Sequence, residues 1–420
     1  MNPALVHLTL ALSSFALAGD PQSLLSQVRK QISVIVESAP HYTCTETIER
    51  SWYHNQRPES PGCDTDRAPQ IGRRTRVETD RLRLDVAVGA DQEMFSWHGE
   101  KTFQTEKVDS LVSAGPIHSG SYFGFLSSIF LEGTAQIDYV GVRTEENHEV
   151  AVFQYTLPKS ESKFDTETDT GPVVLGYHGE FTVDPVNHSL QKFTVIAEER
   201  EVPESAHFCS LHLDTRYEMV NLDGNGFRLP ATVEMTLLDR NREIKHTSTT
   251  YQACRQFLAE SQLRFDDSPA SSALATPHQL KELPPGLKVA IRIMSDTNPA
   301  NSWGGDPVTG ELSDNLTDEH GTVLAAKGTP VKGRLLRMET FFKPQRSYAA
   351  TIQFDQVADY RLHLKSVIET NAQGSIFMPR RLQLDNPPIS SDPAACRFRL
   401  SDKQANLKGA LTHWVTREVP

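Results

Sequence analysis

Apolar residues recur at helical spacing directly after residue 20. Asp20 can cap the N-terminus of a helix, and Pro21 suits its first turn. The apolar positions lie on one face of that helix: Leu24, Leu25, Val28, Ile32, Ile35 and Val36. This spacing predicts an amphipathic helix that ends before Pro40 and packs through one face on another part of the protein.

From Tyr42 onward the period changes from helical to alternating. Leu82, Leu84, Val86 and Val88 alternate with more polar residues, which is typical of a strand with one buried and one solvated face. Similar patterns surround residues 181–183, 190–196, 217–220 and 233–237, with turn sequences at 184–188 and 223–226. These patterns predict antiparallel hairpins. Residues 122–130 are the exception, because their apolar side chains cluster with Ser and Gly in a more helical arrangement.

A polar stretch rich in Ser, Ala and Pro divides the chain. It lacks an apolar period and predicts a linker over residues 259–282, after a first domain at 19–258. Alternating segments resume in a second domain at 283–379, and short strands broken by Gly and Pro predict a small β-barrel or sandwich. The last residues, 380–420, show little period and are expected to form a loosely attached tail.

The fold class expected overall is mainly β with few helices. It comprises a curved antiparallel sheet with packed helices, followed by the small β-barrel or sandwich. A length of 420 residues agrees with more than one domain.

The first eighteen residues resemble an export signal. An apolar run ends in Ala16, Leu17 and Ala18, a small-x-small cleavage pattern, although the residues before the run lack Lys and Arg. We therefore expect a signal peptide at 1–18, cleavage after Ala18, and a mature protein in the periplasm or secreted. No later run is long enough to span a membrane.

The net charge of the chain bears on the class of partner that it can bind. The formal net charge is -12 and the pI is near 5.7, which argues against a phosphate-binding surface over the whole chain. Nucleic acid is therefore not an expected partner, and no sequence pattern calls for a cofactor.

Five cysteines in an exported chain favour disulfides over metal binding. We expect pairs between Cys44 and Cys63 and between Cys209 and Cys254, although sequence alone does not fix the connectivity. Cys396 would then be the odd thiol, either buried or available for cross-linking.

Three segments of the first domain resemble the periplasmic lipoprotein-carrier family, which sorts lipoproteins to the outer membrane. After the N-terminal helix these are Tyr42-Thr43-Cys44, residues 179–185 (GEFTVDP) and residues 226–230 (GFRLP). The resemblance implies a curved antiparallel sheet that wraps helices and shelters acyl chains in an apolar groove. It would place the groove lining or a helical plug at the aromatic cluster Tyr122, Phe123, Phe125 and Phe130. The alternative is that these side chains form ordinary core.

Residues 283–340 are similar to the β-barrel of outer-membrane core proteins of conjugative secretion systems. The similarity rests on the LPPG of 283–286, the strand after it, the GDPV of 305–308 and the AKGTPVKG of 326–333. It implies a fold and not an activity. The helix that forms the membrane pore of those channels has no counterpart here, so a channel is not expected.

One short segment carries metal-binding side chains without the spacing of a standard site. His207 and Cys209 would share one face of a strand while His212 would lie on the other, and Cys209 is expected in a disulfide. No metal site is therefore predicted.

Two further motifs have simpler explanations. Residues 221–226 match the first half of a calcium loop, but Thr232 stands where that loop needs Glu. Ser160 and Lys163 have the spacing of an acyl-enzyme pair, in a polar stretch without a partner motif. No catalytic residue is predicted, and no enzyme class is indicated.

Three functions remain open. The first is a non-catalytic envelope protein that binds an apolar ligand, such as a lipid or a lipoprotein acyl chain, in a groove of the N-terminal sheet. The second is a structural or assembly module that binds only envelope proteins, through exposed strand edges. The third is a hydrolase whose site is assembled from residues far apart in the sequence.

Overall fold

The computed structural model describes most of both predicted domains. The residues described are 20–38, 41–54, 63, 71, 74–89, 93–100, 103, 108, 111–112, 116–117, 122–168, 171–198, 202–203, 205–256, 280–369, 395–401 and 406–418. The predicted signal peptide and nearly all of the predicted linker lie outside these residues.

The helix α1 (Pro21–Ser38) confirms the helical spacing of the first segment. Both carboxylate oxygens of Asp20 accept hydrogen bonds from the first turn, from Gln22 N at 3.3 Å and Ser23 N at 3.2 Å. These bonds satisfy two of the amide groups that every helix start leaves unpaired. Leu25, Val28 and Ile32 are buried on one face, so the amphipathic pattern packs as expected.

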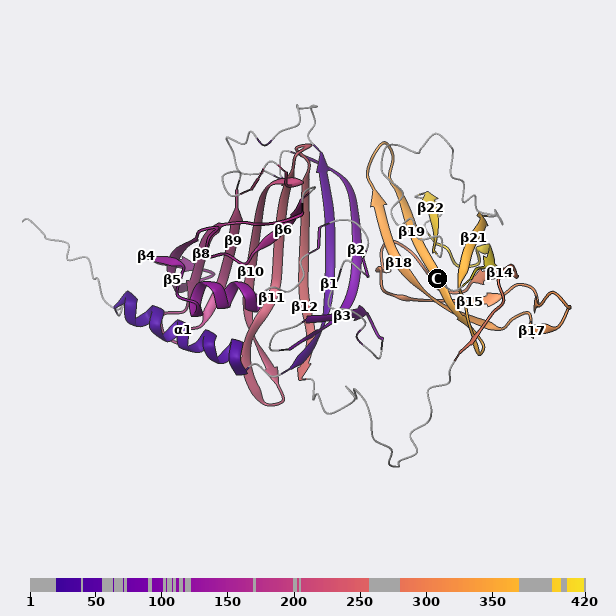
Figure 1. Cartoon of the computed structure of the whole chain (residues 1–420), viewed down its shortest axis with the longest axis horizontal. Coiled ribbons are helices and arrows are strands. Elements are labelled where there is room, and N and C mark those ends of the chain that lie inside the picture. The colour runs from indigo at the N-terminus through magenta and orange to yellow at the C-terminus, as the bar shows by residue number, and fades with distance from the viewer. Residues whose placement is uncertain are drawn as a thin grey trace, which may run out of the picture.

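The first region of the chain forms a wide antiparallel sheet (Figure 1). In spatial order its strands run β3–β2–β1–β12–β11–β10–β9–β8–β5–β4. Their bounds are β1 (Tyr42–His54), β2 (Thr75–Val88), β3 (Glu93–Trp97), β4 (Gln136–Glu145), β5 (His148–Leu157), β8 (Tyr177–Val183), β9 (Leu190–Ala197), β10 (Phe208–Leu222), β11 (Asn225–Asp239) and β12 (Ile244–Gln256).

Few helices accompany this sheet. Besides α1 there is a short α2 (Tyr122–Leu126) that continues into one π-helical turn, η3 (Ser127–Leu131), in the segment predicted to be helical. A separate hairpin is made by β6 (Asp165–Thr168) and β7 (Gly171–Val174). The expected set of helices wrapped by a curved sheet is therefore reduced to α1 and this short segment, although both contribute side chains to the core.

The second region is also made of strands. Their bounds are β13 (Lys281–Glu282), β14 (Lys288–Ile293), β15 (Pro307–Leu312), β16 (Leu316–Thr317), β17 (Val323–Ala325), β18 (Pro330–Phe341), β19 (Ser347–Val357), β20 (Tyr360–Arg361), β21 (Leu364–Glu369), β22 (Ala395–Ser401) and β23 (Leu411–Thr416). The main ladder runs β22–β19–β18–β15–β14–β23–β21. Among the described strands no ladder joins β21 to β22, so the predicted small barrel is not closed.

The expectation of a loosely attached tail from Arg380 is wrong. Strand β22 pairs with β19, and β23 pairs with both β14 and β21. Trp414 of β23 is buried and meets Phe354 at 5.8 Å in an edge-to-face contact. The strand pattern was missed because each piece is short and because three prolines, Pro387, Pro388 and Pro393, precede β22.

The two regions join through hydrogen-bonded strands. Residues 78–81 of β2 pair with residues 338–341 of β18, which makes one continuous sheet of 19 described strands. Gly304 extends this junction, because it donates to Arg81 O at 2.8 Å and accepts from Arg83 N at 2.6 Å. Trp303 lies beside the guanidinium groups of the same two arginines, 4.5 Å and 5.2 Å from its ring centre.

Separate apolar cores lie on the two sides of this junction. In the first region the main core is between α1, α2, η3 and the inner face of β5 and β8–β11. A neighbouring core covers β1–β3 and includes Ile48, Leu84 and Phe95. The second region has its own core around Ile291, Ile352 and Trp414.

Candidate ligand site beneath the N-terminal helix

The inner face of the first sheet is lined by aromatic rings. Phe153, Phe181 and Phe193 stand opposite one another on β5, β8 and β9 and therefore point to the same face. Phe153 stacks on Phe181 at 5.0 Å, and Tyr155 stacks on Phe193 at 5.6 Å. The face is thus an apolar floor on which the helices lie.

The four aromatic residues predicted to line a groove are divided by the structure. Phe125 and Phe130 are buried in the main core, where Phe125 meets Tyr177 at 5.3 Å and Phe130 meets Phe181 at 4.8 Å. Phe123 is half-buried and packs on the neighbouring core over β1–β3. Tyr122 begins α2, and its side chain lies outside the described part. These contacts are those of packed core side chains.

A small cavity lies between α1 and the sheet, and Leu126, the residue after Phe125, lines it. Its volume is about 20 Å³. It is lined by Gln31, Ile32, Ile35, Leu126, His188, Ser189, Leu190, Tyr217 and Arg228. The space holds a group of a few atoms at most, and its lining comes from α1, α2, β9, β10, β11 and the turn before β9.

Two residues that line this cavity each carry a buried hydrogen-bond donor without an acceptor among the described residues. The hydroxyl of Tyr217 is buried without a partner, and the whole residue is only 6% exposed. The Nε of Arg228 is likewise buried and unpaired. An unpaired buried polar group costs about 1–3 kcal/mol, so the pair is a feature that needs an explanation.

The rest of the Arg228 side chain is held firmly. Its Nη1 donates to Gln191 Oε1 at 2.7 Å, to Tyr217 O at 2.9 Å and to Leu190 O at 3.4 Å. Burial lowers the pKa of Arg228 from its ordinary value, while Asp184 and Glu218 act in the opposite direction. Burial raises the pKa of the Tyr217 hydroxyl, so this group stays protonated and remains a donor.

The helix α1 covers this cavity with a limited attachment. Besides its three buried apolar side chains, Gln31 Nε2 donates to Asn187 O at 2.7 Å, in the turn between β8 and β9. The opposite face of the helix is solvated, and Val34 there is 54% exposed.

Buried acids lie farther along the same inner face. Glu46 on β1 is 1% exposed, and its Oε1 accepts a bond of 3.3 Å from the Tyr251 hydroxyl while Oε2 is unpaired. Burial, together with the charge of Glu93, raises the pKa of Glu46 to about 8. Burial raises the pKa of Glu93 to about 8 as well. Burial therefore favours the protonated form of both side chains.

A second hollow opens at the far end of β5. Its volume is about 290 Å³, and its lining is more polar. The residues around it are Thr156, Leu157, Pro158, Lys159, Gly176, Tyr177, Val202 and Pro203. No unpaired buried side-chain donor or acceptor is found among these described residues.

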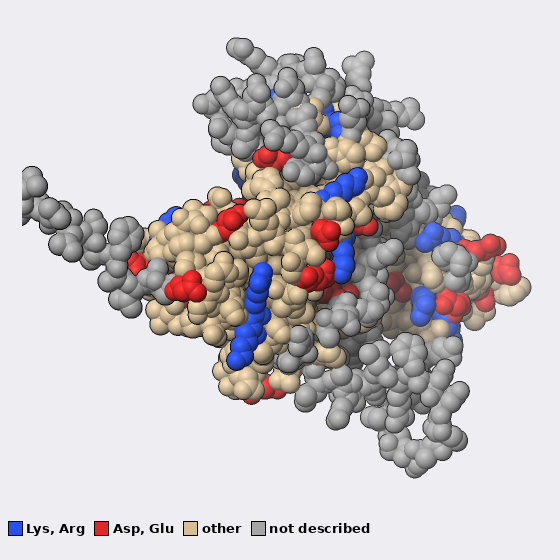
Figure 2. All heavy atoms as spheres, turned by 60° about the vertical axis from the view of Figure 1, so that its left-hand side comes forward, with Lys and Arg blue, Asp and Glu red and all other residues tan. Residues whose placement is uncertain are grey.

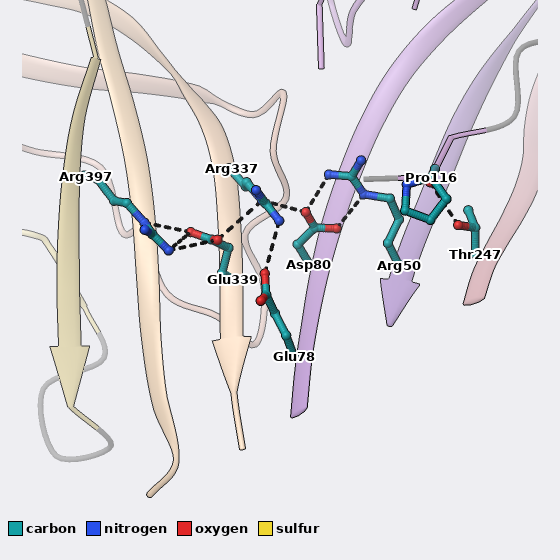
Figure 3. A network of polar contacts seen from close by, with 8 residues as sticks. All are labelled: Arg50, Glu78, Asp80, Pro116, Thr247, Arg337, Glu339 and Arg397. Carbon is teal, nitrogen blue, oxygen red and sulfur yellow. Dashed lines mark hydrogen bonds and ion pairs between the residues drawn. The ribbon is translucent and has the colours of Figure 1, made fainter. Parts of the chain in front are cut away.

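A network of buried charges occupies the junction between the two regions (Figure 3). Asp80 accepts from Arg50 at 2.6 Å and from Arg337 at 2.7 Å, and all three side chains are at most 6% exposed. Arg337 also reaches Glu78 at 3.1 Å and Glu339 at 3.5 Å. Arg397 then binds Glu339 at 2.9 Å. Every carboxylate of this network therefore has an arginine partner.

Both disulfides differ from the predicted pairs. Cys44 of β1 is bonded to Cys254 of β12, and Cys63 is bonded to Cys209 of β10. The first bond joins neighbouring strands at a bulge, where the register shifts between Thr43 and Thr45. The prediction was wrong because it paired cysteines close in sequence, whereas strand order brings Cys44 beside a residue 210 positions away.

The remaining sequence motifs are structural. Residues 221–226 form the hairpin turn between β10 and β11, where Asn221 Oδ1 accepts from Gly224 N at 2.8 Å. Lys163 pairs with Glu132 at 2.7 Å. Within the described ranges no group of three or more His, Cys, Asp or Glu side chains could hold a metal ion. No helix in that part of the chain is long and apolar enough to cross a bilayer.

Neither Tyr217 nor Arg228 was predicted from the sequence. One signal was available, because Pro230 interrupts an otherwise regular strand pattern and proline inside a sheet marks an edge or a bulge. In the structure Tyr217 stands opposite Pro230, directly after a register shift at Arg216.

No protein-family model matches the chain, and no curated protein matches it. Among solved structures, the chain is similar to an outer membrane lipoprotein-sorting protein domain from Vibrio parahaemolyticus, at 13% identity and a TM-score of 0.27, over 57% of this chain and 93% of that one. It is also similar to a DUF1329 family protein from Desulfovibrio piger, at 10% identity and a TM-score of 0.29, over 58% of this chain and 96% of that one. Both similarities are too weak to assign a function to this chain.

Proposed function

We propose that the chain is a non-catalytic binding protein of the cell envelope that takes up an apolar ligand, such as an acyl chain, beneath α1. The observation that carries this proposal is the cavity under α1, whose lining is almost entirely apolar and which lies between that helix and the first sheet. Export is supported by the two disulfides, because disulfide bonds persist in oxidising compartments.

The energetics permit such uptake if α1 moves. Three buried aliphatic side chains of α1 contribute about 1.5–3 kcal/mol each, and an acyl chain gains about 0.8 kcal/mol per buried methylene. A chain of roughly ten methylene groups therefore offsets the displacement of the helix. The cavity marks where ligand and helix compete, since Ile32 and Ile35 line it from α1.

The surface around this site supports an apolar partner. In Figure 2 the end of the molecule that carries α1 and β4 is turned toward the viewer, and its described surface is mostly uncharged, with acidic and basic side chains scattered over it.

The first test is native mass spectrometry of the protein purified gently from its own envelope, with lipid extraction of the same sample. We expect an acyl-bearing species at a fixed ratio to the protein. A protein without any such species, which arrives with a stoichiometric protein partner, would contradict the proposal.

A second test fills the cavity from α1. Ile35→Trp places a larger side chain where Ile35 lines the cavity, and we expect it to lower the binding of a fluorescent hydrocarbon probe. Val34→Trp is the matched control, because Val34 is the next residue on the same helix and points to solvent. Equal binding by the two variants would show that the ligand lies elsewhere.

Docking of another protein is a second candidate function, favoured by one observation. The strand β4 is paired through only one edge in the described structure, and Val140 and Val142 on it are 55% and 48% exposed. An exposed strand edge with apolar side chains can accept a strand from a partner. The protein partner recovered in the first test would support this function.

A further inference from the structure

A basic surface lies at one end of the sheet, although the chain as a whole carries a net charge of -12. It is formed by Arg76 near the start of β2 and by Lys343 and Arg346 in the turn between β18 and β19. We propose that this basic end binds the anionic head groups of a lipid membrane. The surface shares no residue with the cavity under α1, so the proposal holds whether or not that cavity takes a ligand.

Strand pairing brings these cations together. Residues 78–81 of β2 pair with residues 338–341 of β18, so the start of β2 and the turn after β18 meet at the same end of the sheet. Phe342 N donates to Val77 O at 2.9 Å and continues this contact. In Figure 1 the turn between β18 and β19 lies at the upper end of the sheet, beside the upper ends of β1 and β2.

Aromatic rings hold the two arginines of this surface. Arg76 Cζ lies 4.7 Å from the ring centre of Phe342, and Arg346 Cζ lies 6.0 Å from it. Arg346 Cζ is also 5.6 Å from the ring centre of Tyr348. A guanidinium group held against a ring keeps its N–H donors, which can reach phosphate oxygens. The rings therefore limit the motion of both arginines without using their hydrogen bonds.

The charges of this surface are not neutralised from within the protein. Arg76, Lys343 and Arg346 are exposed, and no carboxylate among the described residues forms an ion pair with them. The described acids at this end are paired with other side chains: Glu78 with Arg337, Glu339 with Arg397, Glu243 with His54 and Asp239 with Lys245. The three exposed cations are therefore available to an external anion.

Two further arginines add positive charge beside the turn. Arg397 Cζ and Arg399 Cζ lie 5.8 Å and 5.2 Å from the ring centre of Phe341. Burial, followed by the charge of Arg397, lowers the pKa of Arg399 from its ordinary value. Positive charges thus already repel one another at this end, and a bound anion would relieve that repulsion.

The arrangement fits a membrane better than a single small anion. The cations are on separate exposed side chains, and neither cavity described above is lined by them. A membrane presents many anionic groups that move laterally, so the cations need not converge on one point. Attraction to such a surface falls off within about 8 Å at physiological salt, which screens the acidic residues elsewhere on the chain. This end would therefore face the membrane.

The experiment measures cosedimentation of the full mature chain with lipid vesicles. One set of vesicles contains phosphatidylcholine with about 30% phosphatidylglycerol, and the other contains phosphatidylcholine alone. We expect binding to the anionic vesicles only. Salt screens the attraction, so we expect the binding to weaken about five-fold between about 50 mM and about 300 mM NaCl.

A double variant tests the residues. Lys343→Gln combined with Arg346→Gln removes two charges from exposed side chains. We expect it to lower partitioning into anionic vesicles about 30-fold, because each cation near an anionic surface contributes about five-fold. Lys327→Gln combined with Lys332→Gln is the matched control, since both lysines are exposed near the start of β18, roughly 30 Å from the turn after that strand. The control should stay within about two-fold of the wild type.

Four outcomes would overturn the proposal. The first two are equal binding to the neutral vesicles and equal loss in the two double variants. The third is loss of vesicle binding on addition of about 10 mM inorganic phosphate at constant ionic strength, which would identify a discrete phosphate site. The fourth is no binding to anionic vesicles at low salt. In that case, a stoichiometric protein partner lost only from the Lys343 and Arg346 double variant would assign the surface to an acidic protein.

Discussion

The core beneath α1 and the junction between β2 and β18 both bury polar side chains in a β-sheet, but they differ in how charges are matched. At the junction each carboxylate of Glu78, Asp80 and Glu339 has an arginine partner, while Arg337 Nη1 is left without an acceptor among the described residues. Beneath α1, the Tyr217 hydroxyl and Arg228 Nε are buried without an acceptor among the described residues, and no carboxylate pairs with them there. Paired buried charges hold two parts of a protein in one arrangement, whereas buried donors without an acceptor lower stability.

Removal of Asp80 is expected to have the largest effect on this contrast. Asp80→Ala leaves Arg50 and Arg337 buried without their shared carboxylate, and breaking a buried pair costs about 3–5 kcal/mol. Chemical denaturation measures the loss. Glu145→Ala is the control, since its pair with Arg143 is partly exposed and such pairs are worth about 0–1 kcal/mol. Similar losses for the two variants would show that the junction is not specially stabilised.

The second largest loss of stability is expected at Gly305, whose backbone lies close to that of Arg83 at the junction. A Cβ on Gly305 would lie 2.2 Å from Arg83 O, and its φ of +104° disfavours other residues. Gly305→Ala is therefore expected to cost about 1–3 kcal/mol or more, in addition to the strain of a positive φ. Gly321→Ala isolates that strain, because φ is +80° there and nothing lies within 4 Å of the added Cβ. A thermal unfolding temperature that falls equally for both would contradict the close contact.

The third prediction concerns how the free energy of unfolding depends on pH, through Glu78 at the junction and Glu46 in the first region. Burial, followed by the charge of Glu339, raises the pKa of Glu78 to about 7 from the usual 4.5. The folded state therefore holds this proton more tightly, so stability falls as the pH rises from about 4.5 to 7, by at most about 1.4 kcal/mol per pH unit. Glu78→Gln should remove that part of the fall, as measured by the unfolding free energy at several pH values.

Glu46→Gln gives the matching result in the first region. Since the pKa of Glu46 is raised to about 8, its contribution to the fall should continue from about pH 4.5 up to pH 8. Parallel pH profiles of the wild type and either variant would argue that the corresponding carboxyl group is not buried in a protonated form.

The smallest change in stability is expected from removing one of two tyrosine hydroxyls on the inner face of the first sheet. Tyr217→Phe removes a hydroxyl without a partner, so the ligand-free protein should be unchanged or more stable by up to about 1 kcal/mol. Tyr155→Phe removes a hydroxyl that donates to Thr194 O and should cost about 1 kcal/mol. Equal destabilisation by both, in denaturant titrations, would mean that Tyr217 has an acceptor.

Local periodicity predicted much of the fold. The helix at α1, the hairpin turns at 184–188 and 223–226, and the strand within β2 follow from the spacing of apolar and turn residues. Strand order and register do not follow from such local patterns, and for that reason the disulfide pairs were wrong. Closure of the second region into a barrel and its final strands were misjudged for the same reason.

The site was harder to predict than the fold. Phe125 and Phe130 of the predicted aromatic cluster lie in the main core and Phe123 lies in the neighbouring one, because an apolar cluster in a sequence does not distinguish core from groove. Tyr217 and Arg228 became notable only through a missing acceptor, which is a property of the packed structure. The sequence does contain one sign of the junction. Glu78 and Asp80 are in phase with the buried positions of β2, and a strand with an apolar face does not ordinarily place acidic residues there.

The distance in sequence across the junction has a consequence for biosynthesis. Asp80 and Arg337 are 257 positions apart, so the edge of β2 stays open until most of the chain has been made. Contacts between such distant residues form slowly, and open strand edges favour misassembly while they persist. The nascent first region therefore keeps an unpaired strand edge at residues 78–81, with Asp80 held by Arg50 alone, until β18 has been made and pairs with it.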